Sequence, residues 1–249
     1  MSDGPSGGAG PVGPRGPSPL RLWASIDPGL SRWQWLVKWF LAIPHVIVLV
    51  FLWIAFTILT VVAGVAILFT GRYPRGIFTF NVGVLRWTWR VTAYAFGLLV
   101  TDRYPPFSLR DADYPAGLDL VYPERLSRGL VLVKWWLLAI PHYLILAFLI
   151  GGPWGGGGWW AEGGSWGAKS GGGGGGGGGL LGILVFIAVI GLLFTGRYLP
   201  GLFTLIVGLQ RWVHRVVVYA ALMTDAYPPF RLDQGGQDPP PPPTRVPVP

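Results

Sequence analysis

Trp33–Phe69 reads WQWLVKWFLAIPHVIVLVFLWIAFTILTVVAGVAILF, an apolar stretch of 37 residues whose one charged residue is Lys38. As a single helix it would be about 55 Å long, whereas the hydrocarbon core of a bilayer is about 30 Å thick. The stretch is therefore typical of a membrane-embedded segment, but it is too long for one upright crossing.

The composition of the whole chain agrees with this interpretation. Of its 249 residues, 51% are hydrophobic and only 12% are charged, against about 25% charged residues in an average soluble domain. The absence of cysteine excludes disulfides, zinc–thiolate sites and a cysteine nucleophile. The net charge of +8 comes from basic residues that flank apolar stretches, so we expect anionic lipid headgroups as partners and no nucleic acid.

Two halves of the chain carry the same motifs in the same order, which predicts a tandem duplication. The motifs, given for the first and the second copy, are LSR (30–32 and 126–128), KW (38–39 and 134–135), AIPH (42–45 and 139–142), LFTGRY (68–73 and 193–198), RWxxRV (86–91 and 211–216) and TDxYPPF (101–107 and 224–230).

Together these motifs resemble an actinobacterial family of membrane proteins known as domain of unknown function 4389, here as two tandem copies. The resemblance covers about residues 30–110 and 126–232. It implies an integral membrane protein of bacterial origin, and it implies no activity, substrate or catalytic residue.

The other segments are expected to be tails and connections. The predicted organisation is a disordered Gly/Pro-rich tail (1–29), a first membrane repeat (30–110), a connecting loop (111–125), a second membrane repeat (126–232, with a Gly-rich insertion at 151–179) and a disordered Pro-rich tail (233–249).

The Gly-rich insertion suggests where the apolar segment turns. When the two copies are aligned, the insertion falls at the position of Ile54. Polyglycine has unpaired amides that lipid cannot satisfy, so we expect this position at a membrane surface. The sequence then predicts an all-α integral membrane fold of two repeats, each a helical hairpin followed by an amphipathic, arginine-containing helix. The predicted hairpin helices are Trp33–Trp53 and Ala55–Phe69 in the first copy, and Leu130–Ile150 and Leu180–Phe194 in the second.

The arginine-containing helices, Ile77–Thr101 and Leu202–Thr224, decide the number of membrane spans. If they lie in the plane of the interface, the chain has four spans, and both termini and nearly all basic residues are cytoplasmic. If they span, the chain has six spans and inverted repeats, like many transporters. We favour the in-plane arrangement, because spanning would move many arginines outside.

The candidate site residues are ionic groups repeated near the predicted membrane surface, and each is expected to contact a lipid headgroup or form a salt bridge. They are Arg72, Arg86, Arg90 and Asp102 in the first copy, and Arg197, Arg211, Arg215 and Asp225 in the second. Each aspartate is expected to pair with an arginine, Arg90 or Arg72 in the first copy and Arg215 or Arg197 in the second.

The repeated lysines and histidines have simpler interpretations. Lys38 and Lys134 lie among tryptophans and are expected to extend toward the membrane surface. His45 and His142 follow a proline inside an apolar segment and are expected to pack there by hydrogen bonding. We expect no metal site, no cofactor and no catalytic residue.

The sequence thus predicts a multi-pass, non-enzymatic protein of the plasma membrane, a scaffold or accessory protein whose expected partners are anionic lipid and a membrane protein. The alternative is a small-solute or ion transporter built from duplicated halves. A membrane enzyme acting on lipid is the least favoured class, because the apolar segments contain no paired carboxylates.

Overall fold

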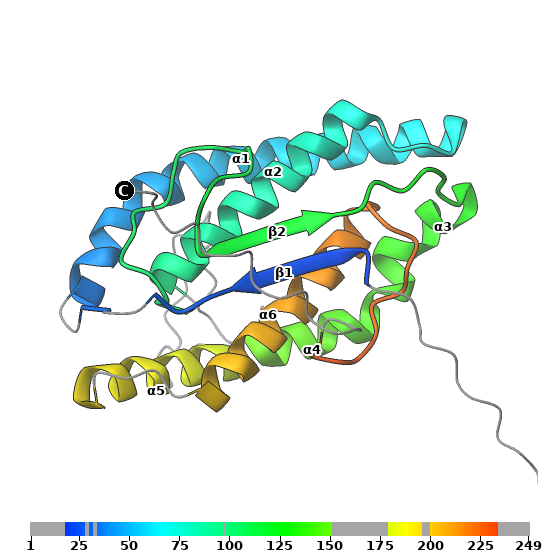
Figure 1. Cartoon of the computed structure of the whole chain (residues 1–249). Coiled ribbons are helices and arrows are strands. Elements are labelled where there is room, and N and C mark those ends of the chain that lie inside the picture. Colours follow the sequence, from blue (N-terminus) through cyan, green and yellow to red (C-terminus); the bar gives the residue numbers. More distant parts are fainter. Residues whose placement is uncertain are drawn as a thin grey trace, which may run out of the picture.

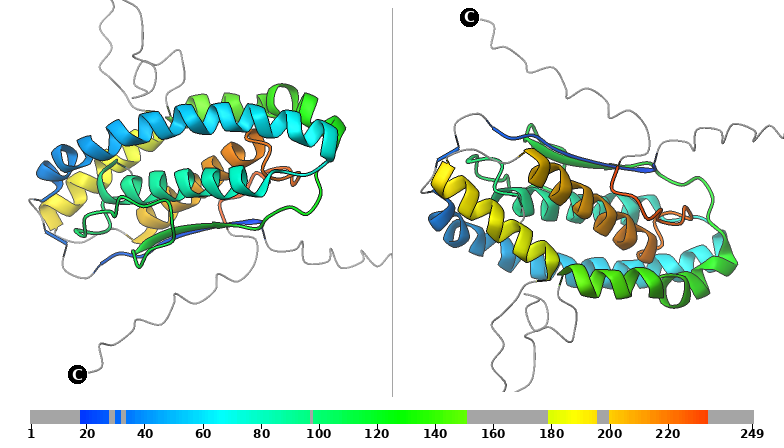
Figure 2. Two further views of the ribbon diagram at one scale, coloured as in Figure 1. Left: turned by 90° about the horizontal axis from the view of Figure 1, so that it is seen from above. Right: turned by 90° about the horizontal axis from the view of Figure 1, so that it is seen from below.

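The computed structural model describes residues 18–27, 30–31, 34–96, 98–150, 179–195 and 200–233. These residues form three layers, with long apolar helices on one side, two further helices in the middle and a two-stranded sheet on the other side (Figures 1 and 2). The hydrophobic core lies between the layers.

The outer layer consists of α1 (Gln34–Thr70) and of α3 (Arg128–Val133), the π-helical turn η2 (Lys134–Leu138) and α4 (Ile140–Ile150). A fifth segment, α5 (Leu180–Thr195), begins beside the end of α4 and continues obliquely (Figure 2). Only one stripe of α1 is turned inward, and its members recur at helical spacing. The buried residues of this stripe are Lys38, Ala42, His45, Leu49, Phe56, Ala63, Gly64 and Ile67.

The middle layer holds α2 (Arg75–Val91), which ends in a π-helical turn, η1 (Thr92–Phe96), and α6 (Pro200–Ala220). Both helices pack between the outer layer and the sheet, so most of their side chains are buried. They correspond to the predicted arginine-containing helices, but they are enclosed by protein on two sides and do not lie free at an interface.

The predicted helical hairpin is wrong for the first copy, because α1 passes through Ile54 without a turn. In the second copy α4 and α5 lie end to end (Figure 2), and the insertion between them falls outside the described residues except for Gly179. The insertion between these two helices therefore does not mark a reversal of the chain.

A one-residue difference between the copies explains the π-helical turn η2. Lys38 and His45 are seven residues apart, whereas Lys134 and His142 are eight apart. A π-helical turn accommodates one extra residue within a helix, and η2 lies between Lys134 and His142. The lysine and the histidine are consequently buried in both copies.

The sheet pairs two strands from corresponding places in the sequence. β1 (Leu20–Ala24) runs antiparallel to β2 (Ala116–Leu120), with Leu22 opposite Leu118. Each of these two leucines lies eight residues before an LSR motif. The pairing therefore brings together positions that stand at the same distance before the two LSR motifs.

The sheet corrects three predictions. The fold is mostly helical but not all-α. β1 lies within the predicted disordered tail (1–29), and β2 lies within the predicted connecting loop (111–125). Two five-residue strands are marginal alone, but Trp89 Nε1 of α2 donates a hydrogen bond to Trp23 O (3.0 Å) and fixes β1 against the middle layer. The tail segments 1–17 and 234–249 fall outside the described residues.

One glycine in each middle helix allows the chain after the TDxYPPF motif to pack closely. A Cβ on Gly83 would lie 2.8 Å from Leu109 Cβ and 2.9 Å from Leu109 O, and a Cβ on Gly208 would lie 2.8 Å from Leu232 Cβ and 3.2 Å from Leu232 O. Backbone atoms cannot move aside cheaply, so these positions require glycine.

We predict that Gly83→Ala and Gly208→Ala each lower the free energy of unfolding by about 1–3 kcal/mol through overpacking. Gly76 and Gly201 are matched controls, because they occupy corresponding positions in the same helices and have no atom within 4 Å of an added Cβ. Alanine at either control position should raise stability by up to about 1 kcal/mol through helix propensity. Thermal unfolding in detergent micelles measures all four; equal effects at both pairs of positions would contradict the prediction.

Candidate functional site

Exposed apolar side chains gather on the outer layer. Examples on α1 are Phe40, Phe51 and Phe69, which are 78%, 67% and 76% exposed. Four further helical segments, α3, η2, α4 and α5, continue the same surface. Their exposed members are Leu132, Trp135, Trp136, Leu137, Ile140, Tyr143, Leu144, Ile145, Leu180, Ile183, Phe186, Ile187 and Ile190. We call the exposed apolar residues of α1, α3, η2, α4 and α5 the apolar face; it is far larger than the apolar patches that soluble monomers expose.

Exposed charged groups lie elsewhere. Arg21 and Asp119 are exposed on the sheet, and Asp111 is exposed in the loop that leads to it. Between residues 34 and 70, α1 contains one charged side chain, Lys38, and it is buried. The apolar and charged surfaces are therefore on opposite sides of the molecule, with further charged groups at its two ends.

A buried lysine ties α1 to the TDxYPPF motif of the first copy. Lys38 Nζ lies 2.7 Å from Asp102 Oδ1 and donates a hydrogen bond to Thr101 O (2.8 Å). The other carboxylate oxygen, Asp102 Oδ2, accepts from the backbone N–H of Ser31 (2.7 Å). The ammonium group also lies 5.3 Å from the centre of the Tyr94 ring. We call this arrangement the lysine–aspartate node.

The second copy forms an equivalent node. Lys134 Nζ lies 2.7 Å from Asp225 Oδ1 and also donates to Thr224 O. Asp225 Oδ2 accepts from the backbone N–H of Ser127 (2.7 Å), and the ammonium group lies 4.8 Å from the Tyr219 ring centre. Burial raises the pKa of Asp225, but the hydrogen bonds from Lys134 and Ser127 outweigh burial and lower it below its ordinary value.

These nodes correct the predicted partners. Asp102 and Asp225 do pair with cations, but with the lysines and not with the arginines that the sequence favoured. The lysines do not extend to the surface either, because both are buried. A buried ammonium group needs a charged partner, and the motif that follows the middle helix supplies one in each copy.

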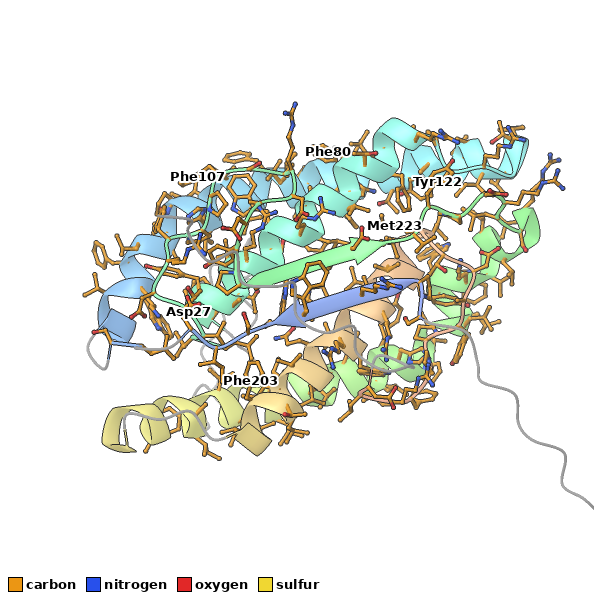
Figure 3. The ribbon with its side chains drawn as sticks, viewed as in Figure 1. Asp27, Phe80, Phe107, Tyr122, Phe203 and Met223 are labelled. Carbon is orange, nitrogen blue, oxygen red and sulfur yellow. The ribbon has the colours of Figure 1, made fainter. Side chains whose placement is uncertain are left out.

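The two repeated histidines are buried against the same motif. His45 stacks on Phe107 with ring centres 4.0 Å apart, and its Nδ1 accepts a hydrogen bond from Trp87 Nε1 (3.2 Å); Figure 3 shows Phe107 beside α1. His142 stacks on Phe230 at 4.6 Å. His45 therefore packs by hydrogen bonding, as expected, whereas both ring nitrogens of His142 are buried without a hydrogen-bond partner among the described residues.

Arg86 and Arg211 each hold the strand of the other copy. Arg86 Nε donates to Leu118 O of β2 (2.9 Å), and Arg211 Nε donates to Leu22 O of β1 (2.9 Å). Arg86 also lies 3.7 Å from Asp119 and 3.9 Å from Asp111. These arginines were expected either to contact a lipid headgroup or to form a salt bridge. Their contacts lie within the protein, which favours a structural role over lipid contact.

Arg90 and Arg215 are buried and hold the segments that follow the TDxYPPF motifs. Arg90 donates to Ser108 O (3.1 Å) and Arg110 O (2.5 Å). Arg215 donates to Arg231 O (2.9 Å) and Asp233 O. Burial and the neighbouring Arg86 lower the pKa of Arg90. These guanidinium groups hold internal segments in place and are not available to lipid.

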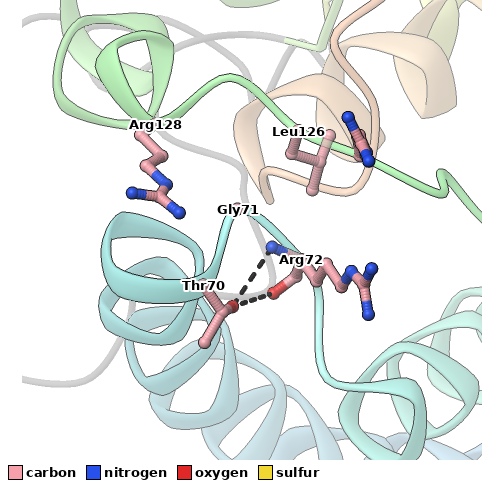
Figure 4. A pocket seen from close by; sticks show the side chains of 6 residues that line it. Thr70, Gly71, Arg72, Leu126 and Arg128 are labelled. Atoms are coloured by element: carbon pink, nitrogen blue, oxygen red, sulfur yellow. Dashed lines mark hydrogen bonds between the residues drawn. The ribbon is translucent and has the colours of Figure 1, made fainter.

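Arg72 occupies a different environment, a polar hollow at the turn between α1 and α2 (Figure 4). The hollow has a volume of about 430 Å³. Its lining residues are Thr70, Gly71, Arg72, Arg125, Leu126 and Arg128. The sequence reasoning missed Arg125 and Arg128, although the position of Arg128 within a repeated LSR motif was a signal. Arg197, the counterpart of Arg72, lies outside the described residues.

Metal binding finds no support in this part of the chain. Among the described residues, no group of three or more histidine, aspartate or glutamate side chains is placed to hold a metal ion.

Comparison with known proteins gives one match. The model of the family described as Domain of unknown function (DUF4389) matches residues 32–108 and 177–231, just over half of the chain. The first segment runs from the start of α1 to the first TDxYPPF motif, and the second runs from α5 to the second motif. No curated protein and no solved structure matches the chain.

We predict that breaking a lysine–aspartate node destabilises the fold more than removing it. Asp102→Asn leaves the Lys38 ammonium buried and unpaired, which should cost about 3 kcal/mol. Replacing both groups, as Lys38→Met with Asp102→Asn, removes the uncompensated charge and should recover most of that loss. Unfolding midpoints of the two single variants and the double variant give the coupling energy; simple additivity of the single effects would contradict the node.

The second prediction concerns pH. Because the pKa of Asp225 is lowered in the folded chain, its contribution to stability is complete above its ordinary pKa of 3.8 and is lost as pH falls through the lowered value. The unfolding temperature in detergent should therefore drop more steeply below about pH 4 in the wild-type chain than in Asp225→Asn. If the unfolding temperatures of the two chains fall in parallel with pH, Asp225 does not supply this pH-dependent stability.

Proposed function

The chain belongs to the DUF4389 family, and we propose that it is a duplicated, non-enzymatic protein of the bacterial plasma membrane that lies in one leaflet and contacts anionic lipid. In this role it acts as a scaffold or accessory component. The observation that carries the proposal is the separation of the apolar face from the exposed charged groups along the full length of the molecule.

The length of the apolar face favours an in-plane position. Its exposed residues on α1 extend from Val37 to Phe69, which is longer than an upright span requires. Within the described residues, three helical stretches are long and apolar enough to cross a membrane, on α1, on α3–α4 and on α6. However, α6 belongs to the enclosed middle layer, and 61% of its apolar stretch is buried inside the protein.

The charged side of the molecule argues in the same direction. An upright α1 would carry the sheet beside it into the hydrocarbon, together with the exposed Arg21, Asp111 and Asp119. Each charge at a bilayer centre costs about 2.5–3.5 kcal/mol on insertion scales. An in-plane molecule places its outer layer in the acyl chains and its sheet in water, so no exposed charge enters the hydrocarbon.

This position retains the predicted cytoplasmic location of the termini and basic groups. The cytoplasmic leaflet carries anionic lipid, which attracts basic residues at the surface. The in-plane position differs from the expected multi-pass arrangement, because both ends of α1 then face the cytoplasm. Duplication fits this geometry, because the two copies then contribute corresponding helices to one apolar face.

The contacts of the repeated polar groups favour a scaffold over the transporter alternative. A transporter needs polar groups along a path, whereas Arg86, Arg90, Arg211 and Arg215 donate to backbone carbonyls. The lysines and aspartates are joined in the nodes. The polar side chains that could carry chemistry are thus used to hold the fold together, which also supports a non-enzymatic role.

We predict a uniform immersion depth along α1. Spin labels on single cysteines at Val37, Ile54 and Phe69, measured by power saturation in anionic vesicles, should report similar depths within one leaflet. A label at Asp111 is the aqueous control. A profile in which Ile54 is deepest and both ends lie near headgroups would indicate a spanning helix and contradict the proposal.

A further inference from the structure

We propose that the hollow lined by Arg72, Arg125 and Arg128 binds the phosphate group of an anionic membrane lipid. The site deepens the proposed function, on which it rests, by naming where and by what chemistry lipid is recognised. It lies where the turn after α1 meets the segment before α3 (Figure 4).

The backbone fixes the position of the three arginines. Gly71 follows the last residue of α1 and has a φ of +69°, a left-handed conformation that suits glycine. Its carbonyl accepts a hydrogen bond from the backbone N–H of Leu126 (2.9 Å), which joins the two segments. A Cβ on Gly71 would lie 3.5 Å from Arg128 Nε, so this guanidinium group lies over the turn.

The charges of the hollow are uncompensated. No carboxylate lines it, and within the described residues the three guanidinium groups have no hydrogen-bond or ion-pair partner. This distinguishes them from Arg86, Arg90 and Arg215, which donate to backbone carbonyls. Guanidinium groups bind phosphate through paired hydrogen bonds, and three of them suit a phosphate with two negative charges better than a single carboxylate.

The surroundings indicate a lipid source for the phosphate. Phe69 is the last large apolar residue of α1 before the hollow and is 76% exposed, and Leu132 on the adjacent α3 is 59% exposed. The hollow thus lies at the edge of the apolar face, at the level where headgroup phosphates meet acyl chains in an in-plane molecule.

The test measures lipid binding to the full-length chain in a nonionic detergent by native mass spectrometry. The probe is dioleoyl phosphatidic acid, with dioleoyl phosphatidylcholine as the comparison lipid. All proteins carry Arg32→Gln and Arg197→Gln, so that the sequence counterparts of Arg128 and Arg72 cannot contribute. We expect tighter binding of phosphatidic acid, and a loss of about fivefold for each of Arg72→Gln, Arg125→Gln and Arg128→Gln, or about a hundredfold for the triple variant.

A second triple variant, with Arg21, Arg103 and Arg110 replaced by Gln, removes the same net charge from the sheet and the loop before it. It should bind phosphatidic acid as the parent does. Unchanged affinity in the first triple variant, or an equal loss in both, would overturn the proposed site.

Inorganic phosphate separates the two possible sources of the ligand. Displacement of phosphatidic acid by an equal concentration of inorganic phosphate would contradict the lipid assignment and identify a soluble phosphate as the occupant. The depth profile of α1 in the first triple variant distinguishes the two proposals. If the first triple variant keeps a uniform depth along α1 but loses its selectivity for phosphatidic acid, the result supports the site. If the parent chain itself shows no uniform depth along α1, the membrane position on which the site rests is overturned.

Discussion

A lysine inside an otherwise uncharged 37-residue helix is the constraint on which the rest of the structure depends. Leaving a buried ammonium group unpaired is costly, so Lys38 must turn toward Asp102, and the stripe that contains Lys38 must face the protein. This choice fixes the rotation of α1 and leaves its remaining apolar sides outward. Lys134 imposes the same condition in the second copy, despite the extra residue that η2 absorbs.

The two strands make the two motif-bearing halves of the chain interdependent. Arg86 holds the strand that precedes the second copy, and Arg211 holds the strand that precedes the first. The turn after α1 likewise bonds to Leu126 at the start of the second copy. Because each copy completes the other, the outer helices are joined into one surface, and that surface is what we propose enters the leaflet.

Much of the architecture could be predicted from the sequence, and the failures have identifiable causes. The repeated motifs correctly identified the family and the helices that contain the arginines. The expected turn at Ile54 was wrong because an insertion was equated with chain reversal, whereas α1 is continuous and α4 and α5 lie end to end. The strands were missed because LRLWA lies beside a low-complexity tail; the shared spacing of Leu22 and Leu118 before the LSR motifs was the available signal.

The site was harder to predict than the fold. Sequence proximity favoured arginines as partners of Asp102 and Asp225, but those side chains are directed to backbone carbonyls, and only the folded chain brings each lysine to its aspartate. Arg125 and Arg128 meet Arg72 only because the two copies interlock.

The central claim, that both ends of α1 lie on the same side of the membrane, is tested most directly by cysteine accessibility, since the native chain contains no cysteine. Asp113 lies in the exposed loop near the start of α1, and Glu124 lies in the exposed segment near its end. An impermeant maleimide should label Asp113→Cys and Glu124→Cys equally in inverted membrane vesicles and should label neither in intact cells. Labelling of the two positions from opposite sides would contradict the account.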